Sequence, residues 1–268
     1  MIDVRSVSFR YQKDWVLRDV TFQVGKGEFI GVIGPNGSGK TTLLKILYRL
    51  FSPQQGEVLF ELIPLKKMTR TDVAKRIAVV AQETYPLFPF RVLEIVLMGR
   101  SPYLGYLMFE SERDLDIAKK AMEWTEVLNF SERPIDELSG GERKRVFIAR
   151  ALAQEPEVIL LDEPTANLDI HHQIEFLDLI LSLNRERGLT IIMTTHDMNL
   201  ASEFCDRLIL LREGRIYKMG SPQEVITKET IKTVYGCEVW VDQNPVSAMP
   251  RISLLRKERH EIETVGRD

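Results

Sequence analysis

The architecture of this chain follows from Gly34-Pro35-Asn36-Gly37-Ser38-Gly39-Lys40-Thr41. These residues fit G-x-x-x-x-G-K-[ST], the pattern of a loop that wraps around phosphate groups. An apolar run at 29–33 predicts a buried strand before the loop, and leucines at helical spacing predict a helix after Lys40. A glycine-rich turn that matched by chance is not expected between such elements. We therefore interpret the loop as a strand-to-helix phosphate site, with the helix N-terminus directed at the phosphates.

The residue types of the loop suit a nucleoside triphosphate with bound Mg²⁺. Glycines at 34, 37 and 39 let the backbone approach phosphate oxygens closely, because they carry no Cβ. Lys40 is expected to reach the β- and γ-phosphates, and the Thr41 hydroxyl to ligate Mg²⁺. The predicted nucleotide-binding residues of this loop are Gly34, Pro35, Asn36, Gly37, Ser38, Gly39, Lys40, Thr41 and Thr42.

A second apolar run, at 158–161, leads into the carboxylates Asp162 and Glu163. Asp162 at a strand end is expected to hold the Mg²⁺ shell, directly or through water. Glu163 points elsewhere because it lies one residue on, and it is predicted to polarise the attacking water. The alternative is a solvated acidic pair after a core strand. The turn at Pro164 and the phosphate loop upstream favour the catalytic interpretation.

His196 follows a predicted strand at 190–194, beyond Thr195. A lone histidine is more often structural than functional, but this strand is expected beside the one that ends at Asp162. We therefore predict that His196 senses the γ-phosphate. The histidines at 171, 172 and 260 have no comparable setting and receive no role.

A separate segment, Leu138-Ser139-Gly140-Gly141-Glu142, precedes a predicted helix at 142–152. The Ser139 hydroxyl and the glycine N–H groups would form a second anion site at that helix N-terminus. The alternative is an ordinary helix start, since Ser-x-x-Glu is a capping pattern, and the segment can do both. One phosphate loop and one extra phosphate-binding helix end suggest a dimer in which each copy completes the site of the other.

Composition limits the classes of function. The chain has 268 residues and a net charge of -3, so no nucleic-acid partner is expected. Two cysteines, Cys205 and Cys237, without Cys-x-x-Cys spacing fit a reducing compartment. The start shows no signal-peptide pattern, and no run approaches the ~18 apolar residues of a membrane span. Action at a membrane would therefore require a partner.

Strand and helix signals alternate along most of the chain, which predicts a mainly parallel sheet. Between about 84 and 153 the strand signals fade, and we interpret this block as a helical lobe. Other expected elements are a helix from Lys40 that ends at 52–53, a helix at 170–186 capped by Gly188, a hairpin at 208–219, a helix from 222 to 235 and a strand near 238–241.

Together these segments resemble those of the ATP-binding-cassette (ABC) ATPases over nearly the whole chain, up to about residue 250. The loop at 34–41 corresponds to Walker A, 138–142 to the signature motif, 158–163 to Walker B, and His196 to the switch histidine. Glu142 stands where the commonest signature has Gln.

The resemblance assigns further residues. Gln82 matches the Q-loop glutamine, which contacts Mg²⁺ and signals to the membrane subunit, and Tyr11 lies where the family stacks an aromatic ring on adenine. Asn167, Leu168 and Asp169 match the D-loop, which crosses the dimer. The resemblance thus implies Lys40, Gln82, Glu163 and His196 as catalytic residues and Thr41, Gln82 and Asp162 as the metal site.

The resemblance also implies the fold: an α/β protein, with a P-loop NTPase core, a mainly parallel sheet, an N-terminal antiparallel β subdomain and an inserted helical subdomain. The ATPase domain would span 1–250, with core segments at 1–83 and 154–220 and the helical subdomain at 84–153. Residues 221–268 would form a C-terminal extension and a charged tail.

The implied activity is hydrolysis of ATP with Mg²⁺ by two copies that close head-to-tail over two ATP molecules. The implied partners are a second copy of the chain, an integral membrane permease and, indirectly, a periplasmic or surface substrate-binding protein. The implied location is peripheral, on the cytoplasmic face of the membrane.

Two further segments are similar to those of the importer ATPases for iron-siderophore, haem and cobalamin. They are residues 92–103, which contain Gly99-Arg100-Ser101-Pro102, and the ending at 234–245. The alternative is a linker without substrate information. Another ABC substrate, an exporter and a non-transport ABC ATPase are the rival functions. The single cassette argues against translation factors, and the intact Glu163 and His196 argue against a degenerate cassette.

Overall fold

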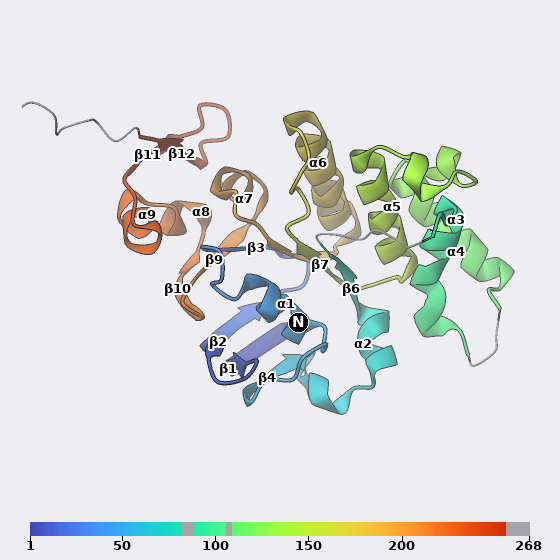
Figure 1. The fold of residues 1–268 in the computed structure, drawn as a ribbon, viewed down its shortest axis with the longest axis horizontal. Coiled ribbons are helices and arrows are strands. Elements are labelled where there is room, and N and C mark those ends of the chain that lie inside the picture. The colour runs from blue at the N-terminus through green and yellow to red at the C-terminus, as the bar shows by residue number, and fades with distance from the viewer. Residues whose placement is uncertain (82–87, 106–108, 256–268) are drawn as a thin grey trace, which may run out of the picture.

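The computed structural model describes residues 1–81, 88–105 and 109–255. Two β-sheets form the centre of this described part (Figure 1). The smaller sheet is antiparallel, with the strand order β2–β1–β4–β5, and is the N-terminal antiparallel part expected from the sequence. Its strands are β1 (Ile2–Arg10), β2 (Trp15–Val24), β4 (Gln55–Phe60) and β5 (Ile63–Pro64).

The larger sheet has the order β10–β9–β3–β8–β7–β6 among the described residues, and only its β9–β10 pair is antiparallel. Its strands are β3 (Phe29–Ile33), β6 (Ile77–Val80), β7 (Val158–Asp162), β8 (Thr190–Thr194), β9 (Arg207–Arg212) and β10 (Arg215–Gly220). In β7, Val158 and Leu160 enter one hydrophobic core, whereas Ile159 and Leu161 enter another. Because both faces are covered, the strand is a continuous apolar run. The predicted mainly parallel sheet is confirmed.

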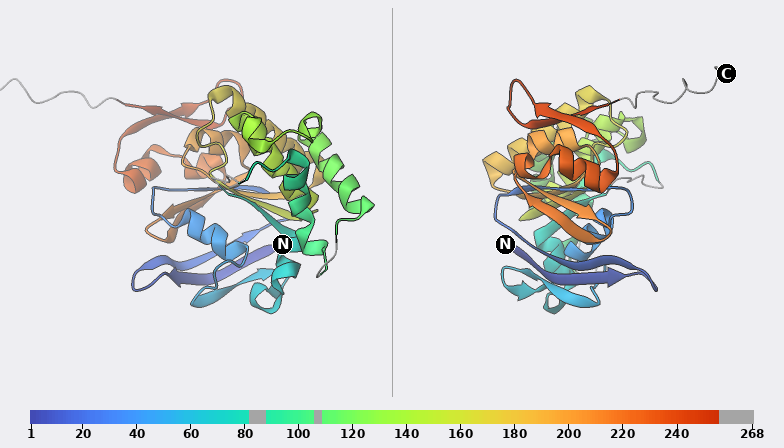
Figure 2. Two further views of the ribbon diagram at one scale, coloured as in Figure 1. Left: turned by 45° about the vertical axis from the view of Figure 1, so that its right-hand side comes forward. Right: turned by 90° about the vertical axis from the view of Figure 1, so that its left-hand side faces the viewer.

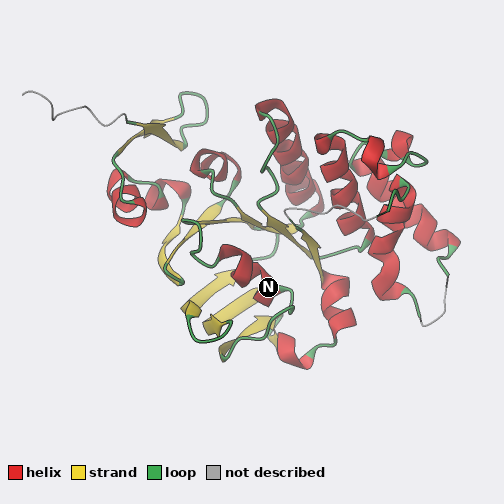
Figure 3. Cartoon of the chain, in the orientation of Figure 1, coloured by secondary structure: helices red, strands yellow, loops and turns green. Residues whose placement is uncertain are grey.

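Helices lie on both faces of the larger sheet (Figure 3). One core lies between the two sheets and includes α1 (Figure 2), and the other joins the larger sheet to α5 and α6. The helices are α1 (Lys40–Leu47), α2 (Arg70–Arg76), α3 (Val92–Leu97), α4 (Glu112–Trp124), α5 (Gly140–Ala153), α6 (Ile170–Arg187), α7 (Met198–Phe204), α8 (Pro222–Val225) and α9 (Lys228–Tyr235). The 3-10 helices are η1 (Leu65–Lys67), η2 (Met98–Tyr103), η3 (Leu128–Phe130) and η4 (Ile135–Glu137).

Residues 88–105 and 109–153 contain helices and, in this described part, no strand. Helices α3, α4 and α5 pack together beside α6, on the right of Figure 1. None of the helices described is both long enough and apolar enough to cross a membrane.

Helix α1 is shorter than predicted, because it ends at Leu47 rather than at 52–53. Arg49 adopts the left-handed conformation, with φ 60°. The N–H of Leu50 then donates to the carbonyl oxygen of Lys45 at 2.9 Å, which closes the helix C-terminus. Glycine usually occupies such a position, so an arginine there gives no stop signal in the sequence.

The C-terminal part also differs from the prediction. The single helix expected from 222 to 235 is two helices, since the Thr227 hydroxyl accepts a hydrogen bond from the N–H of Thr230 at 3.2 Å and starts α9. The expected strand is β11 (Val239–Gln243), and it pairs with a second strand, β12 (Pro250–Leu254). The end of the ATPase domain proposed at residue 250 therefore coincides with the first residue of β12, which pairs with β11. The predicted cap of α6 at Gly188 is confirmed, with φ 65°.

Candidate active site

The loop between β3 and α1 has a backbone that other residue types would strain. Gly34, Gly37 and Gly39 have φ values of 151°, 77° and 105°, in the region that favours glycine. A Cβ on Gly34 would lie 2.3 Å from the carbonyl oxygen of Leu211, and one on Gly39 would lie 2.7 Å from Cδ2 of Leu17. The loop therefore forms a cradle that depends on its glycines.

Lys40 begins α1 and turns its side chain back over this cradle. Its Nζ donates to the carbonyl oxygens of Gly34 at 2.9 Å and of Pro35 at 3.2 Å. Burial holds the pKa of Lys40 below its usual value, although the negative charges of Glu163 and Asp162 act to raise it. The ammonium group is thus held between the loop and both predicted carboxylates.

The Ser38 hydroxyl fits a phosphate ligand. It is buried and has no hydrogen-bond partner among the described residues. A buried polar group without a partner costs about 1–3 kcal/mol, and a phosphate oxygen that accepts from Ser38 would remove that cost. Asn36 is exposed at the tip of the loop, and Thr42 lies buried in the first turn of α1.

Neighbouring strands β3, β8 and β7 bring their carboxyl ends to this loop. Thr41 Oγ1 donates to Asp162 Oδ1 at 3.1 Å, and Thr194 Oγ1 donates to the same oxygen at 2.7 Å. Mg²⁺ prefers oxygen ligands and commonly takes one or two carboxylates together with substrate phosphates. Thr41 and Asp162 therefore suit a Mg²⁺ site that nucleotide completes. Among the described residues, no cluster of three or more His, Cys, Asp or Glu side chains offers an all-protein alternative.

Thr194 is a site residue that the sequence did not identify. Besides orienting Asp162, its hydroxyl accepts a hydrogen bond from the N–H of Glu163 at 3.0 Å. The available signal was a threonine directly after the apolar run Ile191-Ile192-Met193 and before the region predicted to contact the γ-phosphate.

Glu163 and His196 lie together at the same edge. Glu163 has φ 47°, an unfavourable value for a residue with a Cβ, and such strain clusters at functional sites. Its Oε2 lies 3.6 Å from Nδ1 of His196. The Glu163 side chain is 19% exposed and that of His196 64%, so the pair connects the interior of the site to solvent.

Tyr11 lies beside the phosphate loop. Its hydroxyl is 3.1 Å from Thr42 Oγ1, and its ring packs edge-on against Phe9 and Phe51. The residue is 55% exposed, which rules out a core tyrosine. A fixed, exposed ring at this position can stack on a nucleotide base.

Replacing Tyr11 with alanine is expected to weaken ATP binding by about fivefold, because loss of one stacking contact costs about 1 kcal/mol. Titration with a fluorescent ATP analogue measures the change. The matched control is Tyr217→Ala. Tyr217 is also exposed but lies on β10, so this variant should retain its affinity for ATP. Equal affinities for the Tyr11 variant and the control would show that adenine binds elsewhere.

The segment at 138–142 starts α5 with a capping box. Ser139 Oγ accepts from the N–H of Glu142 at 3.3 Å, and Glu142 Oε2 accepts from the N–H of Ser139 at 2.7 Å. The capping interpretation is thus confirmed, and hydrogen bonds to its carboxyl from the side chain and backbone of Ser139 lower the pKa of Glu142. Gly140 has open space around it, Leu138 is buried, and a Cβ on Gly141 would lie 2.6 Å from His172.

Within the chain this segment is apart from the phosphate loop. Helix α5 packs against α3, α4 and α6, whereas α1 packs against β2 and β7, and Figure 1 shows the two helices well separated. An anion held at the start of α5 would therefore belong to a different site from one held in the loop of the same chain.

The segment at 167–169 forms the start of α6. Asn167 has φ 61°, and Leu168 packs against the larger core. Asp169 caps α6, since its Oδ1 accepts from the N–H of His172 at 3.0 Å and lies 2.8 Å from His172 Nδ1. His172, which was assigned no role from its sequence position, thus lies between this segment and Gly141. Gln82 lies outside the described residues, so its Q-loop assignment stays a prediction.

The segment at 98–103 joins the helices of the helical region. Arg100 is buried, and its Nε donates to Asp114 Oδ1 at 2.9 Å while its Nη1 donates to the carbonyl oxygen of Ala153 at 2.7 Å. Its guanidinium group also lies 4.0 Å from the ring centre of Tyr103. Hydrogen bonds from Ser111 and Arg100 lower the pKa of Asp114 to about 2. In this structure the segment therefore ties α4 to the end of α5.

Comparison with known proteins now decides the family. The sequence profile described as ABC transporter matches residues 17–166, more than half of the chain. The chain belongs to the ABC transporter family. This ABC protein is 39% identical over 242 residues to "Ferric enterobactin transport ATP-binding protein FepC" of Escherichia coli (strain K12), and the match covers 90% of this chain and 89% of that protein.

Solved structures confirm the fold class of the ABC protein. An inward-facing metal-chelate type ABC transporter superposes with a TM-score of 0.85 at 29% identity, over 96% of this chain and 97% of that one. A dimeric ATP-binding cassette in a post-hydrolysis state, bound to ADP and Pi, superposes with a TM-score of 0.70 at 31% identity, over 82% and 98%. The prediction of an ABC-type ATPase is thereby confirmed.

Proposed function

We propose that this ABC protein is the ATP-hydrolysing subunit of an importer for a metal chelate. The meeting of Lys40, Asp162 and Glu163 at one edge of the sheet carries the hydrolytic part of the proposal. The import part is supported by FepC, which is named for ferric enterobactin transport, and by the metal-chelate type transporter that shares the fold.

Phosphoryl transfer requires neutralisation of charge on the transferred group. Lys40 would exchange its bonds to the loop carbonyls for phosphate oxygens. Thr41 and Asp162, together with Gln82, would hold Mg²⁺, which supplies positive charge at the β- and γ-phosphate oxygens. Thr194 would keep the Asp162 carboxylate oriented for this task.

Glu163 would position the attacking water and accept its proton, because a carboxylate at the edge of the site can act as a general base. His196 lies within 3.6 Å of that carboxylate and would hold the γ-phosphate beside it. Tyr11 would stack on adenine at the other end of the nucleotide.

Two copies would complete each site. The start of α5, with Leu138, Ser139, Gly140, Gly141 and Glu142, would lie against the γ-phosphate bound by the partner, and residues 167–169 would lie at the crossing between the copies. The separation of α5 from the phosphate loop within the chain and the dimeric ATP-binding cassette of similar fold support this arrangement.

The test of the import proposal is uptake by cells that lack this protein. We expect accumulation of a ferric siderophore to fall and to return with the wild-type gene but not with a Glu163→Gln gene. Parallel uptake of haem and cobalamin distinguishes the chelate classes. Normal uptake of all three, together with retention of a normally exported compound, would identify an exporter. We also expect a permease and a substrate-binding protein to be encoded beside this chain.

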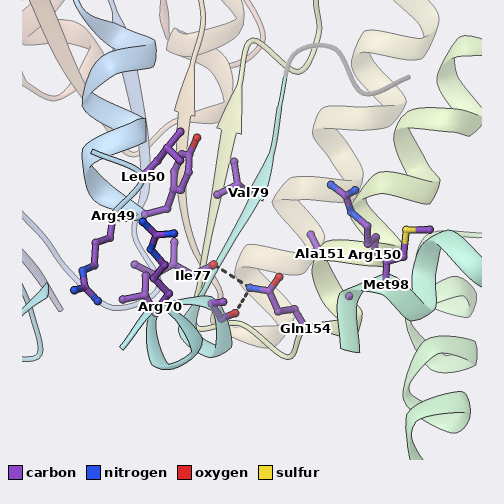
Figure 4. A pocket seen from close by; sticks show the side chains of 13 residues that line it. Arg49, Leu50, Arg70, Ile77, Val79, Met98, Arg150, Ala151 and Gln154 are labelled. Atoms are coloured by element: carbon purple, nitrogen blue, oxygen red, sulfur yellow. Dashed lines mark hydrogen bonds between the residues drawn. The ribbon is translucent and has the colours of Figure 1, made fainter. Parts of the chain in front are cut away.

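A pocket of about 370 Å³ at the junction of the core and the helical region suits contact with the permease (Figure 4). Arg49, Arg70 and Arg150 line it together with apolar side chains such as Met98. In the described part of the chain, none of these three guanidinium groups forms an ion pair with a carboxylate. The Gln154 amide donates to the carbonyl oxygens of Ala74 and Ile77 and fixes one wall.

This combination of cations without a carboxylate partner and apolar walls favours an acidic, partly apolar loop of the permease, because complementary charge steers partners together and like charge repels them. Docking there, on the cytoplasmic face of the membrane, would couple closure of the ABC dimer to the permease.

Charge reversal in the pocket, Arg70→Glu, is expected to lower recovery of a co-expressed permease by tenfold or more. Two like charges placed together at an interface cost several kcal/mol, and affinity falls tenfold for each loss of about 1.4 kcal/mol. Affinity purification from membranes measures it. Arg215→Glu, on β10 at the far edge of the sheet, is the control and should retain the permease. Full recovery with the Arg70 variant would exclude this pocket as the docking site.

A further inference from the structure

Lys144 connects the second turn of α5 to the turn that follows Glu163. Its Nζ donates to the carbonyl oxygen of Pro164 and, at 2.6 Å, to that of Ala166. Burial alone lowers the pKa of Lys144, to about 8. Among the described residues, the amine of Lys144 bonds to backbone carbonyls and to no carboxylate. Burying an amine costs free energy, so this arrangement suggests that Lys144 serves to fix those carbonyls.

The two carbonyls belong to a tight turn with unusual backbone geometry. Glu163 and Asn167 both have positive φ, at 47° and 61°. The N–H of Ala166 donates to the carbonyl oxygen of Glu163 at 3.2 Å, so the turn and the backbone of Glu163 are directly linked. A shift of the turn would therefore move the Glu163 carboxylate.

The start of α5 is attached to the same region at two further points. The ring of His172 fills the space where a Cβ of Gly141 would lie, and Asp169 holds that ring at 2.8 Å. Arg145 Nη2 lies 3.6 Å from Glu175 Oε2 on α6. These surface contacts align α5 with α6, whereas the contact of Lys144 is with the turn after Glu163 itself.

We propose that Lys144 is a positioning residue that couples the two ATP sites of the dimer. This inference rests on the head-to-tail dimer proposed above. There, the start of α5 contacts the nucleotide of the partner, whereas Glu163 acts on the nucleotide of its own chain. Lys144 joins these two parts of one chain, so closure of α5 on the partner's ATP would pull on the turn and set Glu163 for hydrolysis.

The test compares Lys144→Met, which removes the donors but keeps a long apolar stem, with Lys144→Arg, which restores a cation and donors. We expect the Met variant to lose about tenfold in kcat, since a small misplacement of a catalytic group costs at least that much. Its Hill coefficient for ATP should fall to about 1, the value for uncoupled sites, while that of the wild type exceeds it. Affinity for ATP under monomeric conditions should not change, and the Arg variant should recover most of the cooperativity.

Lys119→Met, on the exposed face of α4, is the matched control and should behave as the wild type. Wild-type cooperativity in Lys144→Met would overturn the inference and leave the dimer intact. Equal losses in the Met and Arg variants, accompanied by a lower unfolding temperature, would also overturn it, because the amine would then only support the fold. A wild-type protein that hydrolyses ATP without cooperativity and stays monomeric with ATP would instead refute the proposed dimer, and the coupling with it.

Discussion

Glu163→Gln is expected to abolish steady-state ATP hydrolysis while ATP still binds. The amide has nearly the same shape as the carboxylate but can neither accept a proton nor carry charge, and loss of a general base lowers rates by about 10²–10⁴-fold. The backbone N–H of residue 163 bonds to Thr194 without involving the side chain, so the backbone is expected to keep its place in the variant. Release of phosphate over time measures turnover, and equilibrium titration measures ATP affinity.

The same variant separates hydrolysis from association. If two copies close over ATP and reopen after hydrolysis, the Glu163→Gln protein should accumulate as a dimer with ATP but not with ADP, as size-exclusion chromatography would show. Glu186→Gln, an exposed position on α6, is the control and should turn over normally. Unimpaired hydrolysis by the Glu163→Gln variant would show that another group acts as the general base. Strictly monomeric behaviour with bound ATP would contradict the completion of each site by a partner.

Much of the candidate site could be predicted because its chemistry is local in the sequence. The cradle at 34–41 depends on glycines whose positive φ is almost a property of the residue type. Asp162 ends, and Glu163 directly follows, a strand whose apolar character marks it as buried on both faces. Parallel strands then bring their carboxyl ends to one edge, so the meeting of Lys40 with the two acids follows from the fold class.

The features that the sequence missed depend on contacts between distant segments. Thr194 orients Asp162 only because β7 and β8 pair in register, and Lys144 reaches Ala166 only because α5 packs beside α6. The early end of α1 depends on Arg49 in a conformation that glycine usually adopts, so the residue type indicated continuation. Tertiary packing decides the roles of Thr194 and Lys144, whereas the end of α1 depends on a local backbone conformation that the residue type does not indicate.

Lys40→Ala is expected to weaken ATP binding itself, unlike Glu163→Gln. The Nζ of Lys40 is held over the loop by the carbonyl oxygens of Gly34 and Pro35. From there it can reach the β- and γ-phosphates with little rearrangement of its side chain. Loss of charged hydrogen bonds worth about 1.5–3 kcal/mol corresponds to roughly ten- to hundredfold lower affinity. Titration with ATP and, separately, with AMP measures where along the nucleotide the loss occurs.

The comparison between the two nucleotides identifies the cause. AMP has neither a β- nor a γ-phosphate, so its weaker binding should hardly respond to Lys40→Ala if the lysine acts on those groups. Lys45→Ala lies in the same helix and should leave both affinities unchanged. Equal losses for ATP and AMP would mean that the loop itself has collapsed, because Gly34 and Pro35 would have lost the donor that holds their carbonyls. A selective loss for ATP would place the ammonium group at the terminal phosphates, where hydrolysis needs it.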